Sequence, residues 1–335
     1  MGGVGPLNPP ILGDFELGWI LVGALLVDPI VGDPWSLLHP VQVMGWVIKG
    51  YSDFVLGVLK GALLRRLAGV VLLLLLMLGS GFVSWGFVLA AKHLHPIAGL
   101  LVAVVMLASC LAGRSLRDAA VDVLLPLEDG DLAGARSQLS RYVGRDTAAL
   151  DHAEILRAVT ETVAENSVDG VMAPLFWAIV GMFTPLGPVP LAFGYKAVST
   201  LDSMVGYLRE PYRDLGWASA NMDDLLTWIP CRLTVLSLAL FSGRFRQVWA
   251  VCAQDGPKDP SPNSGWSEAA YAAVLQVQLG GVNSYQGVVR EKPILGLGGR
   301  SLSPEVVRQA LGWNRVLILS WAAVAIAIYA YINRA

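Results

Sequence analysis

The chain has few charged residues and few cysteines for its length. Asp, Glu, Lys and Arg make up 15% of the 335 residues, whereas roughly 25% is typical of soluble domains. The 24 basic residues are balanced by 26 acidic ones, which argues against a nucleic-acid binder built on a basic face. The 3 cysteines are far apart and form no C-x-x-C pair. Neither a disulfide framework nor a zinc site is therefore indicated.

Other familiar sequence signals are also missing. The first 14 residues lack the basic region of a secretory signal peptide, so we expect the first apolar run to remain as an anchor. Neither a P-loop nor a G-x-S-x-G elbow occurs in the chain. No short run of alternating apolar and polar residues indicates a β-sheet, and no repeat at a fixed period is found.

Hydrophobic residues make up 55% of the chain, which is typical of an integral membrane protein. A helix needs roughly 20 mostly apolar residues to cross a bilayer. We expect such spans at 68–91, 97–113 and 316–332, with a further one near 15–31. Two more apolar stretches, 171–193 and 226–242, contain prolines and are expected to be broken or re-entrant helices. The predicted fold is an all-α, polytopic integral membrane protein.

We expect a single integral membrane domain over residues 1–335 with two long polar segments. Segment 114–170 has a helical pattern, with Asp146 as the expected N-cap and Gly170 as the expected stop, and segment 243–315 is polar. Basic residues are concentrated in 32–66, 114–170 and 243–315, which the positive-inside rule places on the cytoplasmic side. The side on which 195–225 lies stays open, because the flanking stretches either cross the membrane or re-enter it.

A ladder of charged side chains marks the predicted helix over 146–169. Its members recur at spacings of three and four and share one face, which Asn166 and Asp169 extend: Glu154, Arg157, Glu161 and Glu165. Two carboxylates one turn apart beside an amide suit Mg²⁺, which prefers oxygen ligands. The alternative is a solvated face with ordinary Arg–Glu ion pairs.

Ionisable residues also lie between and within the two proline-containing stretches. They are Lys196, Asp202, Asp223, Asp224 and Arg232, and the hydroxyl residue Ser203 lies beside Asp202. Ionisable groups near membrane depth are costly and are therefore functional candidates. The cations can hold phosphate or carboxylate groups, and the aspartates can hold Mg²⁺ or an amine. Alternatively, Lys196 reaches for the membrane interface and the aspartate pair caps the next helix.

Two turn-rich segments complete the candidate residues. The first holds Asp28, Asp33 and His39, of which His39 is either an acid–base group or a structural histidine beside proline. The second is the polar segment that contains Asn263, Ser264, Glu268, Asn283 and Tyr285. Its PNSG turn precedes a helix start, where free backbone N–H groups can bind a phosphate.

Four sequence blocks occur in order along about residues 25–290. They read GDP…HPV, then ETVAENSVDGVMAPLFWA, then YK…TLDSM…DD…IP.R, then SPNSGWSEAA…LGG.N.Y.G. In these blocks the chain resembles the adenosylcobinamide-phosphate synthase family of cobalamin biosynthesis (CobD/CbiB). The resemblance implies an all-helical protein of the bacterial inner membrane with its active site facing the cytoplasm. It also implies ATP-dependent joining of adenosylcobyric acid to (R)-1-amino-2-propanol phosphate, or to ethanolamine phosphate, to give adenosylcobinamide phosphate.

The resemblance, with the chemistry it requires, assigns roles to the matching residues. Catalytic roles are expected for Glu161, Glu165, Asp169, Asp202 and His39. Metal binding is expected for Glu161, Glu165, Asp223 and Asp224, and substrate or phosphate binding for Lys196, Arg232, Asn166, Ser203, Asn263, Ser264, Glu268, Asn283 and Tyr285. ATP and Mg²⁺ are the expected cofactors, because a carboxylate must become an acyl phosphate or adenylate before an amine can attack it. Membrane lipid and other membrane enzymes of the cobalamin nucleotide-loop pathway are the expected partners.

Two non-catalytic hypotheses compete with this one. The same broken helices and buried charges suit a membrane carrier or sensor that binds an anionic ligand, although the chain has no inverted repeat. A relative that has lost catalysis and acts in signalling is the second alternative, and the intact ENSVDG and SPNSGWSEAA blocks argue against it. ATP consumption that depends on both the corrinoid acid and the amine would distinguish a ligase.

Overall fold

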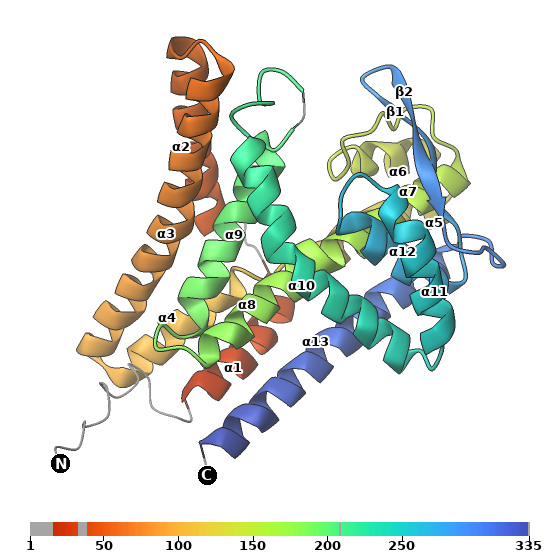
Figure 1. Ribbon diagram of the computed structural model, residues 1–335. Coiled ribbons are helices and arrows are strands. Elements are labelled where there is room, and N and C mark those ends of the chain that lie inside the picture. The colour runs from red at the N-terminus through yellow and green to blue at the C-terminus, as the bar shows by residue number, and fades with distance from the viewer. Residues whose placement is uncertain (1–15, 33–38, 208, 334–335) are drawn as a thin grey trace. The chain divides into compact units, whose positions relative to one another are not determined.

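The computed structural model describes residues 16–32, 39–207 and 209–333, which are mostly helical (Figure 1). The elements are α1 Glu16–Val31, α2 Pro40–Val58, α3 Ala62–Leu94, α4 Pro96–Ala108, α5 Gly113–Glu128, α6 Leu132–Leu139, α7 His152–Asn166, η1 Ser167–Met172, α8 Ala173–Met182, α9 Pro188–Val205, α10 Trp217–Phe241, α11 Phe245–Asp255, η2 Gly256–Lys258, α12 Ser264–Leu275, β1 Leu279–Tyr285, β2 Val288–Leu295 and α13 Pro304–Ile332. The chain divides into two compact units. Unit 1 is Met1–Ala112, Pro174–Leu225 and Ser320–Ala335, and unit 2 is Gly113–Ala173 and Leu226–Leu319.

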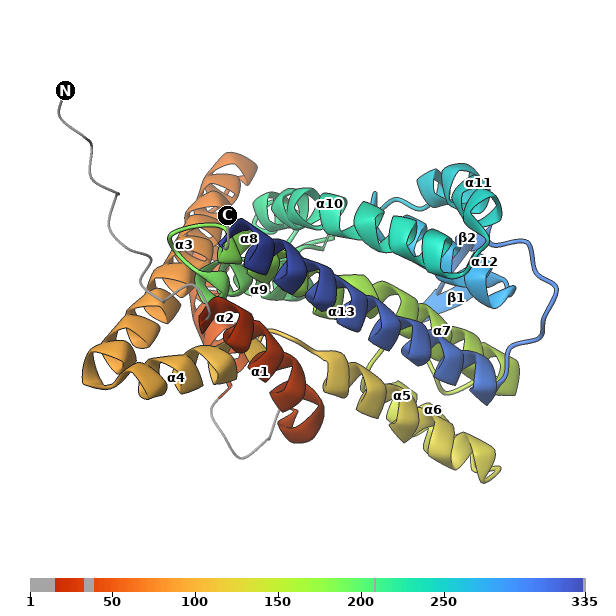
Figure 2. The same cartoon turned by 90° about the horizontal axis from the view of Figure 1, so that it is seen from below.

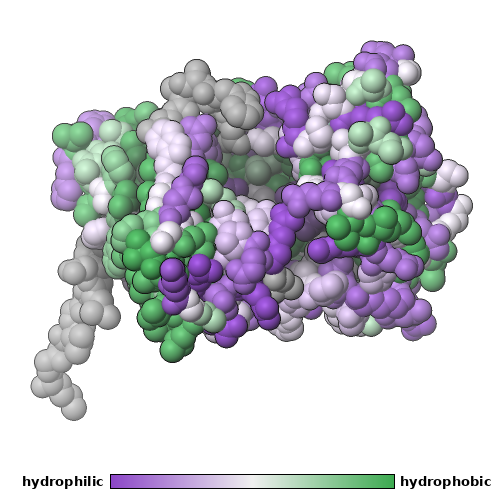
Figure 3. Space-filling view, turned by 90° about the horizontal axis from the view of Figure 1, so that it is seen from above, coloured by the Kyte–Doolittle hydropathy of each residue, from purple (hydrophilic) through white to green (hydrophobic). Residues whose placement is uncertain are grey.

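Four helical segments are long and apolar enough to cross a membrane. They are Ala62–Leu94, Pro96–Glu128, Trp217–Phe241 and Pro304–Ile332. They include the spans expected at 68–91, 97–113 and 316–332, so the polytopic all-α class is confirmed. Within the described residues, the span expected near 15–31 is the apolar helix α1, Glu16–Val31. Many large apolar side chains of these helices are exposed, as lipid contact requires, and Figure 3 shows hydrophobic patches beside hydrophilic ones on one face.

The two proline-containing stretches behave differently. Residues 171–193 are broken as expected, because α8 ends at Met182 and α9 begins at Pro188, a position where proline costs no helical hydrogen bond. Residues 226–242 differ from the expectation, since Pro230 lies inside the continuous helix α10. The Pro230 carbonyl accepts a hydrogen bond from the Thr234 hydroxyl at 2.8 Å. Such side-chain bonds help a helix to tolerate an internal proline.

Unit 1 is a bundle of closely packed helices. Helix α3 packs on α4 and α9, while α1 packs on α4 and α2 packs on α9. Gly69 of α3 allows one of the closest approaches, because a Cβ there would lie 2.1 Å from the Leu215 carbonyl oxygen. Val55, Ala68 and Leu215 form a small buried cluster at this point.

Unit 2 combines helices with a two-stranded hairpin. Helices α5, α6 and α7 pack together, and α11 and α12 pack on each other and on β2 (Figure 2). Helix α12 also contacts α7 and β1. Unit 2 is therefore assembled from two stretches of sequence, one before residue 174 and one after residue 225.

The hairpin shows that the expectation of no β-sheet is wrong. Strands β1 and β2 pair antiparallel, with Tyr285 opposite Val288 and Leu279 opposite Leu295. The two residues between them, Gln286 and Gly287, have φ values of 53° and 77°, as a two-residue hairpin turn of the right twist requires. Glycines and a proline within the strands interrupt the alternating pattern from which strands are predicted.

The helix expected over 146–169 also has different ends. Asp151 is the N-cap of α7 and forms a capping box with Glu154. Asp146 instead accepts hydrogen bonds from Ser284 and from the backbone of Gln286 and Gly287 at the hairpin turn. Gly170 does not stop the helix, because the chain continues through the π-helical segment η1 into α8. The capping roles predicted for Asp146 and Gly170 are therefore wrong.

Candidate active site

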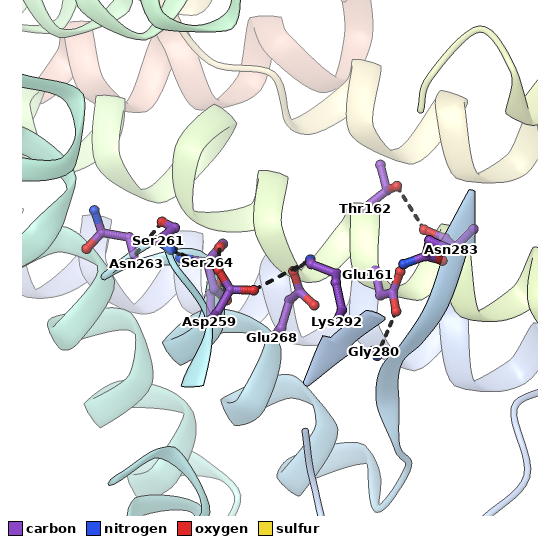
Figure 4. Close-up of polar contacts among 12 residues, drawn as sticks. Glu161, Thr162, Asp259, Ser261, Asn263, Ser264, Glu268, Gly280, Asn283 and Lys292 are labelled. Carbon is purple, nitrogen blue, oxygen red and sulfur yellow. Dashed lines mark hydrogen bonds and ion pairs between the residues drawn. The ribbon is translucent and has the colours of Figure 1, made fainter. Parts of the chain in front are cut away.

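Charged side chains of unit 2 gather where α7, α12 and the hairpin contact one another (Figure 4). Helix α7 supplies Glu161 and Glu165, which lie on one face because they are one turn apart. Helix α12 supplies Glu268, strand β2 supplies Lys292, and the loop before α12 supplies Asp259. The contacts of these side chains form two groups, one around Glu161 and one around Lys292.

Glu161 is a buried carboxylate held by two arginines. Its Oε2 accepts a hydrogen bond from Arg145, and the side chains of Arg145 and Glu161 are 8% and 2% exposed. Its Oε1 accepts the Gly280 N–H at 2.8 Å and lies 3.7 Å from Arg157 Nη1. These contacts tie α7 to β1 and compensate the buried charge. The catalytic and metal-binding roles predicted for Glu161 remain predictions.

Lys292 is surrounded by three carboxylates, and we call Lys292, Glu165, Asp259 and Glu268 the lysine cluster. Lys292 Nζ lies 3.1 Å from Glu268 Oε1 and 3.8 Å from Asp259 Oδ2. Glu165 interacts electrostatically with Lys292 and Asp259 and forms no hydrogen bond with any residue that the structure describes. Glu268 Oε2 and Asp259 Oδ2 are buried and have no hydrogen-bond partner among the described residues.

Burial and charge shift the pKa values in this cluster in opposite directions. Burial raises the pKa of Glu268 to about 8, although the Lys292 ammonium opposes the shift. Burial likewise raises the pKa of Glu165. For Lys292, burial alone lowers the pKa, but the carboxylates of Glu268, Glu165 and Asp259 outweigh this and raise it. Lys292 is therefore cationic at neutral pH, while Glu268 exchanges its proton close to neutral pH.

The SPNSGW block folds against Asp259, which faces Lys292. Asp259 Oδ1 accepts hydrogen bonds from the Ser261 N–H at 2.9 Å and from the Ser264 hydroxyl at 3.2 Å. The Ser261 hydroxyl in turn accepts from the N–H groups of Asn263 and Ser264, each at 3.2 Å. Two of the backbone N–H groups offered at this helix start are thus already bonded within the turn.

Arg232 holds the same block from α10. Its Nη2 donates to the Pro262 carbonyl at 2.8 Å, and its Nη1 lies 3.4 Å from Asn263 Oδ1. Its guanidinium group lies 4.3 Å from the centre of the Trp266 ring, within cation–π range. The sequence block and the arginine predicted from separate motifs are therefore brought together in unit 2.

The remaining predicted residues of unit 2 lie around this centre. Asn283 Oδ1 accepts from Arg145 at 3.0 Å and from Arg157 at 3.2 Å, so it helps to hold the hairpin. Asn166 is exposed at the end of α7, and Asp169 lies half-buried in η1. Tyr285 lies at the end of β1, with the Arg290 guanidinium over its ring.

Unit 1 holds a separate group of predicted residues. Asp202 interacts electrostatically with Asp223 and Asp224. One buried oxygen of Asp202 and one of Asp223 have no hydrogen-bond partner among the described residues. The Lys196 ammonium forms no ion pair within the described ranges of the chain, and the Ser203 hydroxyl donates to the Thr200 carbonyl at 2.9 Å.

His39 and Asp33 were predicted from the first turn-rich segment. His39 is the N-cap of α2, and its Nδ1 accepts the Val41 N–H at 3.3 Å. This contact is a structural role, and a catalytic role for His39 remains a prediction. Asp33 lies outside the described residues.

The carboxylates do not form a preorganised metal cage. Among the described residues, no group of three or more His, Cys, Asp or Glu side chains is arranged to hold a metal ion. Mg²⁺, however, is usually held by one or two carboxylates together with substrate phosphates. The free aspartate oxygens of unit 1 fit this kind of binding better than Glu161, whose oxygens are engaged by Arg145 and Gly280.

Sequence reasoning missed Lys292, Asp259 and Arg145. Arg145 and Lys292 were counted only as basic residues of long loops. Asp259 lies four residues before Asn263, in the polar segment 243–315, and was not singled out. The hairpin brings Lys292 back beside Glu268 of α12. Only a prediction of the two strands would therefore have placed Lys292 at the site.

Comparisons with known proteins agree with the sequence blocks. The family model described as CobD/Cbib protein matches residues 21–314. A protein named "Cobalamin biosynthesis protein CobD" from Synechocystis sp. is 51% identical over 301 residues, which cover 90% of this chain and 88% of the relative. "Cobalamin biosynthesis protein CbiB" from Salmonella typhimurium is 41% identical over 316 residues, covering 93% and 95%. No solved structure matches the chain.

Proposed function

This chain belongs to the CobD/CbiB family of cobalamin biosynthesis proteins, and from that membership we propose that it is adenosylcobinamide-phosphate synthase, an ATP-dependent amide ligase. It joins a carboxylate of adenosylcobyric acid to (R)-1-amino-2-propanol phosphate, or to ethanolamine phosphate, and releases adenosylcobinamide phosphate. The observation that carries the proposal is the lysine cluster, in which buried carboxylates of raised pKa lie beside a fixed cation. Strongly shifted titratable groups of this kind are typical of acid–base sites.

The reaction sets three tasks. The carboxylate oxygen must first attack ATP and become an acyl phosphate or an adenylate, because a carboxylate and an ammonium ion otherwise form only a salt. The amine must then lose a proton and attack the activated carbonyl carbon. The phosphate charge that develops must be stabilised throughout.

The residues of unit 2 suit the proton transfer. Glu165 and Glu268 are carboxyl groups whose pKa is raised by burial, which makes them stronger bases than exposed carboxylates. Lys292 keeps the local charge balanced while a proton is gained or lost. Arg232, fixed against Asn263 and Pro262, presents a cation near the start of α12 and suits a phosphate group.

The residues of unit 1 suit polyphosphate. Lys196 is a cation with no ion pair in the described ranges, and it can hold a phosphate oxygen. Asp223 and Asp224, with Asp202, would hold Mg²⁺ that accompanies ATP. The metal, when bound, neutralises charge on the phosphate oxygens. The carboxylates of Asp202 and Asp223 supply the hard oxygen ligands that Mg²⁺ prefers.

We further propose that the protein is a multi-pass protein of the inner membrane. The four apolar helical segments support membrane insertion, and the basic residues of 114–170 and 243–315 support a cytoplasmic position for the polar parts of these two segments. Other membrane enzymes of the nucleotide-loop pathway are the partners that such a location favours.

The proposal is tested with the detergent-purified protein. Adenosylcobyric acid, aminopropanol phosphate, Mg²⁺ and ATP are supplied together, and the corrinoid is followed by mass. We expect a product that contains the condensed amine phosphate, with ATP consumed only when both other substrates are present. Unchanged corrinoid that nevertheless binds to the protein would favour the carrier or sensor instead.

A further inference from the structure

The lysine cluster has more carboxylate oxygens than its one cation satisfies. Lys292 Nζ contacts Glu268 Oε1 at 3.1 Å, yet Glu268 Oε2 and Asp259 Oδ2 accept no hydrogen bond from the described residues. The side chains of Glu268 and Asp259 are 0% and 6% exposed. Buried carboxylate oxygens without a donor are costly. The arrangement therefore favours a further cationic hydrogen-bond donor at these oxygens.

The type of cation follows from what surrounds the oxygens. A divalent metal would bind next to the Lys292 ammonium and be repelled by it, because Lys292 lies 3.1 Å and 3.8 Å from the same carboxylates. The described residues also provide no three acidic, His or Cys side chains arranged around a metal position. A primary ammonium group carries a single charge and several N–H donors, which match the unpartnered oxygens of Asp259 and Glu268, while Glu165 adds negative charge nearby.

We propose that the lysine cluster is the binding site for the primary ammonium group of the amino-alcohol phosphate, and that Glu268 accepts the proton this group loses. The inference rests on the proposed ligase function and assigns its amine subsite. Glu165 is half-buried and Lys292 is 27% exposed. Through these two side chains the cluster remains in contact with solvent.

The proton transfer balances with amide formation. The ammonium group gives one proton to the Glu268 carboxylate and becomes a neutral amine. The amine lone pair forms the C–N bond at the activated carbonyl carbon, and the C–O bond to the phosphate breaks, with its electron pair leaving on the phosphate oxygen. The departing phosphate takes the second proton from nitrogen, and Glu268 later returns its proton to water. The pKa of Glu268, raised by burial to about 8, suits a group that must accept and release a proton near neutral pH.

The first test measures binding without turnover. Isothermal titration of the full-length protein above about pH 8, where Glu268 is ionised, compares 1-amino-2-propanol phosphate with 1,2-propanediol 2-phosphate, in which a hydroxyl group replaces the ammonium group. We expect the wild-type protein to prefer the amine by about tenfold or more, as a charge-assisted contact provides. In Glu268→Gln, which keeps the shape and removes the charge, the preference falls below about threefold. The control Glu128→Gln breaks a partly exposed ion pair with Arg308 and keeps the wild-type preference.

The second test uses the pH dependence of kcat/KM for the amine. In the wild-type protein we expect kcat/KM to rise with pH through about 8, because Glu268 must be deprotonated to act as the base. In Glu268→Gln this rise disappears and the rate falls by about 100-fold or more. Should Glu268→Gln fail to fold, Glu165→Gln replaces it in the binding test, because Glu165 has no hydrogen bond among the described residues to lose.

The outcomes separate this inference from the function on which it rests. A wild-type protein that forms no product and binds neither compound refutes the ligase. A protein that forms product while Glu268→Gln and Glu165→Gln keep the full preference for the amine refutes only the amine subsite. Variants that lose affinity for Mg²⁺, measured with Mg²⁺ alone, and keep the amine preference would replace the ammonium site by a metal site.

Discussion

Replacing Arg145 by Gln should loosen the hairpin of unit 2. Arg145 donates to Glu161 Oε2 and, at 3.0 Å, to Asn283 Oδ1. The change leaves the Glu161 carboxylate buried without its main cation. Oε1 of the same carboxylate accepts the N–H of Gly280 in β1 at 2.8 Å. Loss of the cation should therefore weaken the attachment of β1 to α7.

The size of the effect follows from the burial of the pair. Removing one partner of a buried ion pair costs about 3–5 kcal/mol. Arg157 remains 3.7 Å from Glu161 Oε1 and compensates part of the lost charge, so we expect the lower end, about 3 kcal/mol. Since about 1.4 kcal/mol is a factor of ten, local opening of the hairpin becomes about 150-fold more frequent.

Hydrogen exchange followed by mass spectrometry measures this opening in the hairpin peptides. Backbone amides of β1 should exchange about 150-fold faster in Arg145→Gln when exchange follows the opening equilibrium. The matched control is Arg308→Gln, which breaks a pair with Glu128 whose side chains are 50% and 34% exposed. An exposed pair contributes at most about 1 kcal/mol, so the control should change exchange by less than about fivefold. A change below about fivefold in Arg145→Gln as well would refute the role assigned to the buried pair.

Two further predictions concern the same hairpin. The hydrogen bond from Ser284 and those from the Gly287 and Gln286 backbone lower the pKa of Asp146. This bonding therefore protects the turn above about pH 4 and is lost as the pH falls through the lowered pKa. The protection of the turn amides, which is their exchange rate relative to the intrinsic rate at the same pH, should fall at low pH in the wild type and lose this pH dependence in Asp146→Asn. In the second, Gly287→Ala adds only backbone strain at φ 77° and should cost about 1 kcal/mol. Gly280→Ala also places Cβ 1.9 Å from the Pro293 carbonyl oxygen and should cost about 1–3 kcal/mol more. Equal exchange rates in the two glycine variants would contradict this close approach.

The membrane helices could be predicted from the sequence because their signal is local. A long apolar run such as 68–91 has few alternatives to a spanning helix, and the structure has Ala62–Leu94 there. Pro230 was wrongly taken to predict a broken helix, because a proline can lie inside a helix when the surrounding protein supports it. The first turn of α7 was misplaced by five residues, since Asp146 and Asp151 are equally good caps as residue types and differ only in their tertiary contacts.

The candidate site could be predicted only in part because its contacts are not local. The spacing of Glu161 and Glu165 and the SPNSGW block named several of its residues. The hairpin could not be predicted from the sequence, since its turn is Gln286-Gly287 rather than Asn-Gly and its strands contain glycines and Pro293. Without the hairpin, Lys292 could not be placed beside Glu268, and Glu161 looked free to bind metal although Arg145 and Gly280 engage it.

The division of unit 2 into two stretches of sequence has a consequence for synthesis on the ribosome. Glu161 and its partner Gly280 are 119 residues apart, and translation at roughly 5–20 residues per second separates their appearance by roughly 6–24 s. During most of that interval α7 has been made, but α12, β1 and β2 have not. The helices between them, α8, α9 and α10, emerge and can enter the membrane first. We therefore expect the contacts of the charged centre of unit 2 to form late in biogenesis, after most of the hydrophobic helices have inserted into the membrane.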